Sequence, residues 1–109
     1  SDICNFDPLT GAIYLKSDKS DSIKDTSVFG DRGNDTFEIG DFKNSVLIDG
    51  GKDFDILRLW GNLDDYQFTS SSDNKTLTIE DSGSVLTVKN VEAIYYGDSE
   101  QAYKISDFA

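Results

Sequence analysis

The sequence predicts an all-β domain, in which about three parallel coils are completed by an antiparallel β cap. The apolar residues come in runs of six residues or fewer, and polar turn formers bound each run. No segment keeps the apolar period of a helix, which favours strands over helices. The aspartates lie beside Gly, Asn and Ser, a setting typical of turns. A length of 109 residues indicates a single domain, residues 1–109.

The first part of the chain, about residues 1–62, carries a rough internal repeat. Gly11, Gly30 and Gly50 recur about 20 residues apart, and a second column of turn formers is offset by about 10 residues. That second column consists of Ser20–Asp21, Gly40–Asp41 and Gly61–Asn62. Short apolar runs lie between the columns, at Ala12–Leu15, Val28–Phe29, Phe37 with Ile39, Val46–Ile48 and Ile56–Trp60. This layout predicts a coil with two strands and two turns per circuit, whose turns stack along each edge.

The second part, about residues 63–109, has a different pattern. Turn signals at Asp73–Lys75 and Asp81–Gly83 bound two stretches, Thr76–Glu80 and Ser84–Lys89, that are apolar at every second position. Such alternation predicts an antiparallel hairpin or meander with one buried face, which caps the open edge of the coil. Further strands are expected at Tyr66–Thr69, Val91–Tyr96 and Tyr103–Ile105.

Composition restricts the classes of function. The net charge of −11 at pH 7 argues against nucleic acids and anionic membranes as partners, and no apolar run is long enough for a membrane span. The chain has no histidine, which is the commonest general base, and it shows no nucleophile motif, so we expect that it is not an enzyme. Because Cys4 is the only cysteine, no internal disulfide can form, and a bound metal is the candidate staple for this small domain.

Two stretches, Gly30–Glu38 and Gly50–Arg58, follow the nonapeptide pattern Gly-Gly-x-Gly-x-Asp-x-U-x, where U is a large apolar residue. Glycine permits the positive φ angles with which a turn aims several carbonyls at one point, and the aspartate adds a carboxylate. The motifs start 20 residues apart, so we expect their turns to stack on one edge with an ion between them. Calcium takes about six to eight oxygen ligands and accepts carbonyls, so the motifs predict a Ca²⁺ site.

On these residues, and over roughly residues 28–98, the chain resembles the RTX, or haemolysin-type calcium-binding, family. The later segments Trp60–Phe68 and Val88–Asp98 are similar to the strands that end many such arrays. The resemblance implies a short parallel β-roll whose facing turns hold calcium through carbonyls and aspartates. Carried over residue by residue, it implies as metal ligands the backbone carbonyls of Gly30, Arg32, Gly51 and Asp53 and the side chains of Asp35 and Asp55. Two positions depart from the pattern, because Asp31 and Asp53 stand where the family has glycine.

The resemblance further implies a calcium-binding structural module of a secreted or surface protein, which folds on binding Ca²⁺ after type I export. Its expected location is extracellular, including a cell or virion surface. An alternative function is adhesion or surface assembly, in which the same calcium-stabilised fold holds another protein or a surface glycan. The candidate platform residues are Trp60, Tyr95, Tyr96 and Tyr103, although such aromatic residues more often pack in the core or at edges.

Other hypotheses stay open at this point. The Gly/Asp motifs are also compatible with ordinary β-turns that bind no metal. The chain as a whole is also compatible with an accessory domain of a secreted enzyme. Asp7 with Thr10–Gly11 is a candidate for a degenerate turn below Gly30, which would add a second calcium site. The Asp7–Pro8 bond is a candidate for calcium-dependent self-processing, and its alternative is a loop proline that holds Asp7 extended.

Overall fold

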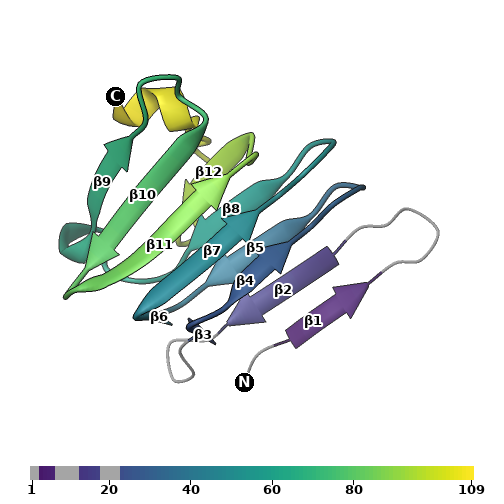
Figure 1. Ribbon diagram of the computed structural model, residues 1–109, viewed down its shortest axis with the longest axis horizontal. Helices are drawn as coiled ribbons and strands as arrows, with labels where there is room; N and C mark the ends of the chain where they lie inside the picture. Colours follow the sequence, from purple (N-terminus) through teal and green to yellow (C-terminus); the bar gives the residue numbers. More distant parts are fainter. Residues whose placement is uncertain (1–2, 7–12, 18–22) are drawn as a thin grey trace.

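The computed structural model describes residues 3–6, 13–17 and 23–109, which form three β-sheets and two short 3-10 helices (Figure 1). The first sheet has the order β1 (Ile3–Phe6), β2 (Ile13–Ser17), β5 (Thr36–Ile39), β8 (Ile56–Leu59), β12 (Ala93–Tyr96). The second has the order β4 (Ser27–Phe29), β7 (Ser45–Asp49), β11 (Ser84–Lys89), β10 (Thr76–Asp81), β9 (Gln67–Ser70). The third pairs β3 (Ile23–Lys24) with β6 (Phe42–Lys43), and the helices are η1 (Leu63–Asp65) and η2 (Ile105–Phe108). The all-β prediction is confirmed.

The chain alternates between the first two sheets. β4 and β7 lie in the second sheet, whereas β5 and β8, which follow them in sequence, lie in the first. β4 pairs with β7 and β5 pairs with β8, in both cases parallel and 20 residues apart in register. Figure 1 shows the β4–β5 and β7–β8 turns next to each other at one end of these strands. The alternation therefore brings equivalent points of successive turns into contact.

The core lies between the inward faces of the two large sheets. On β5 and β8 every second residue is buried, as expected for strands with one face against a core. The side chains that meet there are all at most 1% exposed: Phe37, Ile39, Leu57 and Leu59 from the first sheet, and Val46, Ile48, Leu77, Ile79, Leu86 and Val88 from the second. Full burial of one such side chain contributes about 1.5–3 kcal/mol, so this apolar layer is the main source of stability.

Both sheets continue beyond residue 62, where the sequence predicts an antiparallel cap. β10 pairs antiparallel with β9 and with β11. β10 and β11 correspond to the two stretches whose alternation predicts strands. β11 also pairs parallel with β7, and β12 pairs parallel with β8. The C-terminal strands are therefore joined edge to edge to the strands of the repeat.

A cluster of aromatic rings closes the C-terminal side of the core. Tyr66 stacks on Phe42 and meets Phe68 edge-on, and Phe68 stacks on Phe108 of η2 at 4.7 Å between ring centroids.

Among the described residues, neither short helix has the length or the hydrophobicity of a membrane span. The proposed degenerate turn at Asp7 with Thr10–Gly11 and the Asp7–Pro8 bond lie outside the described residues.

Candidate metal centre

Two stacked turns form the candidate site. The first, residues 30–35, joins β4 to β5, and the second, residues 50–55, joins β7 to β8. Strand pairing aligns Phe29 with Asp49 just before the turns and Thr36 with Ile56 just after them. The backbone N–H of Lys52 donates to the carbonyl of Asp31 at 2.7 Å, which links the turns directly.

The backbone of both turns takes the left-handed conformation at alternate positions. φ is +64° at Asp31 and +89° at Gly33 in the first turn, and +78° at Gly51 and +69° at Asp53 in the second. The two aspartates that replace the glycines of the motif thus adopt the conformation that glycine would have, which aspartate tolerates better than most residues. Asp53 gains a partner there, because its Oδ2 accepts a hydrogen bond of 2.8 Å from the N–H of Gly33.

The carboxylates of Asp35 and Asp55 lie inside this stack. Both side chains are 0% exposed, and they are the only polar or charged side chains that are fully buried in the described part of the chain. Oδ1 of Asp55 accepts a hydrogen bond of 2.8 Å from the N–H of Asp35, whereas Oδ2 of Asp55 has no hydrogen-bond partner. A buried acceptor without a partner costs about 1–3 kcal/mol, and more when it is charged.

The electrostatics of Asp55 reflect this position. Burial raises the pKa of its carboxyl well above the usual value, while the hydrogen bond from the Asp35 N–H acts in the opposite direction. The neighbouring carboxyl groups of Asp35 and Glu92 raise the pKa of Asp55 further. The site therefore disfavours negative charge on Asp55 unless a positive charge compensates it.

Glycine is required where the two turns approach each other. A β-carbon on Gly30 would lie 2.1 Å from Oδ2 of Asp35 and 2.6 Å from the carbonyl oxygen of Gly50. A β-carbon on Gly51 would lie 2.3 Å from the carbonyl oxygen of Asp31. Carboxylate and carbonyl oxygens thus converge on space that any larger residue would fill.

These donors fit a hard divalent cation. The groups that converge are carboxylates and backbone carbonyls, without sulfur or imidazole, and this is the ligand chemistry that Ca²⁺ prefers. Across the described residues, no three or more His, Cys, Asp or Glu side chains gather in one metal-binding group. Backbone carbonyls would therefore have to supply much of the coordination, as the glycine-rich turns allow.

The structure distributes the six predicted ligands unevenly. Gly30, Asp35 and Asp55 lie together in the buried part of the stack, and Gly51 lies against the carbonyl of Asp31. Arg32 and Asp53 lie in the same two turns; they are expected to contribute backbone carbonyls, so the exposure of their side chains does not bear on that prediction. Sequence reasoning missed Gly50, whose carbonyl oxygen approaches Gly30.

It also missed Glu92. Pairing of Ala93 with Ile56 places Glu92 level with Asp55 and Asp35, and Oε1 of Glu92 accepts a hydrogen bond of 2.6 Å from the N–H of Asp55. The 20-residue period could not reveal Glu92, because 37 residues separate it from Asp55. The signal that remains is an acidic residue directly before a strand, as in the two motifs.

The four aromatic residues considered for a binding platform do not form one surface. Tyr95 and Tyr96 are adjacent on β12, so their side chains point to opposite faces of the sheet. Tyr96 packs against Tyr103 at 5.2 Å between ring centroids, within the C-terminal aromatic cluster. Tyr95 lies on the other side, 4.7 Å from the guanidinium of Arg58, and Trp60 donates its indole N–H to Glu38.

Comparison with known proteins found no matching family model and no match among curated proteins. Among solved structures, the chain is similar to the extracellular lipase LipA from Serratia marcescens, with a TM-score of 0.43 and 19% sequence identity. The match covers 80% of this chain and 14% of the lipase chain. Because the chain spans so small a part of that lipase, the lipase's activity is not transferred to it.

Proposed function

We propose that the chain is a calcium-binding structural module of a secreted or surface protein, built as a short parallel β-roll and ordered by the cation. The observation that carries the proposal is the buried pair of carboxylates, Asp35 and Asp55, contributed by equivalent positions of two stacked turns. The carbonyl oxygen of Gly50 approaches the same point as Oδ2 of Asp35. In this proposal the chain itself has no catalytic role.

Asp35 and Asp55 give the module its dependence on a cation. Their negative charges lie in a buried site of a chain whose net charge is already −11. Self-repulsion and desolvation both oppose the compact state. A bound calcium ion would supply two positive charges and accept oxygens from both turns. Calcium binding would then stabilise the stacked turns relative to the unfolded chain, because the free energy of binding adds to the free energy of folding.

The calcium affinity that we expect of such a module matches an extracellular location. Extracellular calcium modules bind at about 10⁻⁴–10⁻³ M, so such a module stays empty at cytosolic calcium levels. Outside the cell, a free concentration ten times the Kd adds about 1.4 kcal/mol of stability, and each further tenfold adds about the same. Folding after export follows from this difference.

The test is a calcium titration of the whole chain, followed by calorimetry and circular dichroism. We expect heat of binding, a gain in β-structure and a higher Tm for the wild type. The paired variant Asp35→Asn with Asp55→Asn keeps side-chain size, and we expect it to lose these responses. Asp64→Asn is the matched control, because it removes an exposed carboxylate on η1.

Each result decides the proposal. A response in the wild type and in Asp64→Asn, absent from the paired variant, supports it. A wild type that binds no calcium at millimolar concentration overturns it, and so does a paired variant that responds as strongly as the wild type.

A further inference from the structure

The contacts that define the first candidate site recur one level further along the stack. Strand pairing aligns Phe29 with Asp49 and Asp49 with Lys89, so Gly30, Gly50 and Asn90 are equivalent in register. A β-carbon on Gly50 would lie 2.3 Å from the carbonyl oxygen of Asn90 and 2.6 Å from Oδ2 of Asp55. At Gly30, the carbonyl of Gly50 and Oδ2 of Asp35 occupy the same two places.

The hydrogen bonds recur in the same way. The N–H of Gly30 donates to the carbonyl of Asp49 at 2.8 Å, and the N–H of Gly50 donates to the carbonyl of Lys89 at 2.9 Å. The N–H of Asp35 donates to the Asp55 carboxylate, just as the N–H of Asp55 donates to the Glu92 carboxylate. Residues 90–92 therefore act as a third turn, although they carry none of the glycine motif.

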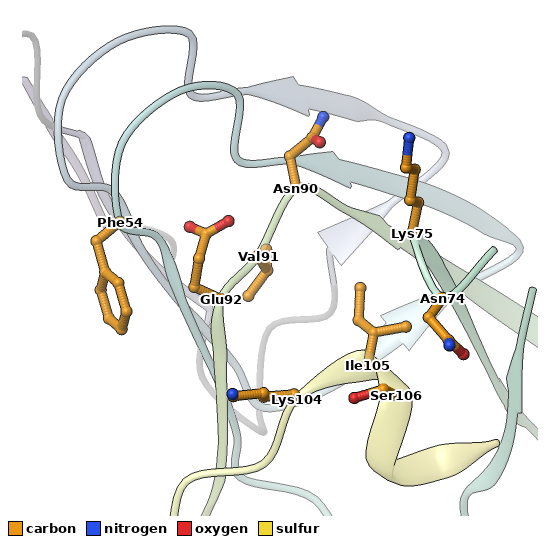
Figure 2. A pocket seen from close by; sticks show the side chains of 9 residues that line it. All are labelled: Phe54, Asn74, Lys75, Asn90, Val91, Glu92, Lys104, Ile105 and Ser106. Carbon is orange, nitrogen blue, oxygen red and sulfur yellow. The ribbon is translucent and has the colours of Figure 1, made fainter.

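This third turn is shorter and more open than the other two. It has three residues, 90–92, where the second has six, 50–55, and it offers fewer carbonyls. The side chains of Asn90 and Glu92 are exposed. Figure 2 shows Asn90, Val91 and Glu92 along one wall of a groove of about 590 Å³, with Phe54 from the second turn beside them. Solvent thus reaches the third turn directly.

We propose a second site for a hard divalent cation between residues 50–55 and 90–92, held by the carboxylates of Asp55 and Glu92 and the carbonyl of Asn90. The proposal rests on the proposed function and extends it to a segment outside the repeat. The observation that supports it is Oδ2 of Asp55, which is buried, has no hydrogen-bond partner and lies, like the carbonyl oxygen of Asn90, close to where a β-carbon on Gly50 would be. Water from the groove completes the coordination.

The second site has a structural consequence. Between the second turn and the third, the chain forms β8, η1 and then β9, β10 and β11, the antiparallel part of the second sheet. A cation shared by Asp55 and Glu92 links residues 90–92, which follow β11, to the turn at residues 50–55. Calcium then orders the C-terminal strands as well as the repeat.

The test counts calcium ions on the intact chain by native mass spectrometry, with hydrogen exchange to locate them. We expect two ions on the wild type and one on Glu92→Gln, which keeps the oxygen that accepts from the Asp55 N–H. Calcium-dependent protection of residues 90–97 is expected to disappear in Glu92→Gln, while protection of residues 30–36 remains. Glu100→Gln, an exposed glutamate on the same C-terminal segment, is the matched control and should bind two ions.

A second variant separates this proposal from the proposed function. Asp35→Asn removes only the first site, so we expect it to retain one ion with protection at residues 90–97. One ion on the wild type that Asp35→Asn abolishes overturns the second site and leaves the proposed function intact. Two ions on Glu92→Gln also overturn the second site, and no ion on the wild type overturns both proposals.

Discussion

The substitution Gly30→Ala tests how closely the two turns approach each other. Gly30 does not lie in the left-handed region, so its backbone alone accepts alanine, and the loss of glycine's freedom in the unfolded chain would stabilise the fold by about 0.4–1 kcal/mol. The new β-carbon would, however, meet the carbonyl oxygen of Gly50 at 2.6 Å and the Asp35 carboxylate at 2.1 Å. Because real β-carbons essentially never come within 3.0 Å of such atoms, the turns must separate.

The magnitude follows from what the separation breaks. Overpacking of a tight site costs about 1–3 kcal/mol. The bonds from Lys52 N–H to the Asp31 carbonyl and from Asp35 N–H to the Asp55 carboxylate weaken, at about 1 kcal/mol each. After the entropic gain is subtracted, we expect a net loss of about 2–4 kcal/mol. At the entropy of unfolding per residue that is usual for globular proteins, this loss of stability corresponds to a Tm lower by roughly 8–16 °C.

The assay is thermal unfolding by circular dichroism, with and without millimolar calcium. Gly83→Ala is the control: Gly83 is left-handed at φ +84° but has no atom within 4 Å of its β-carbon position, so strain alone costs about 1–2 kcal/mol. We expect Gly83→Ala to keep the calcium-dependent rise in Tm and Gly30→Ala to lose it. A Tm for Gly30→Ala equal to or above that of the wild type would refute the close approach of the turns.

Two further predictions concern residues away from the turns. Burial raises the pKa of Tyr66 to about 12, against the opposing hydrogen bond with the backbone of Gly61, so its folded pKa exceeds the unfolded value of 10.0. The folded state therefore holds this proton more tightly, and the stability it contributes is complete below pH 10.0 and is lost as the pH rises toward 12. We expect a fall of about 2–3 kcal/mol in urea unfolding between those pH values, reduced in Tyr66→Phe; an identical fall in that variant would contradict the assignment. Arg58 donates to the carbonyls of Gly97 and Ser99 and stacks on Tyr95, so Arg58→Lys should lower the free energy of unfolding by about 1–2 kcal/mol, and a Tm unchanged within 1 °C would count against this role.

Local pattern was sufficient to predict much of the fold. Short runs such as residues 36–39 and 56–59 alternate between buried and half-buried side chains, and this alternation is a property of the strand itself. The spacing of 20 residues between the motifs also predicted the neighbourhood of Asp35 and Asp55. When two turns with the same pattern recur at a fixed spacing between parallel strands, their stacking follows from that spacing.

What the sequence by itself determined is therefore the class of the fold and the stacking of the two motifs, because each follows from local alternation or from the 20-residue spacing. The partnership of Glu92 with Asp55 was decided only by the tertiary structure. It depends on β12 pairing with β8 after the strands β9, β10 and β11, which do not follow the 20-residue repeat of the motifs. Strand order of this kind is set by the burial of two sheet faces against each other, and no single stretch of sequence encodes it.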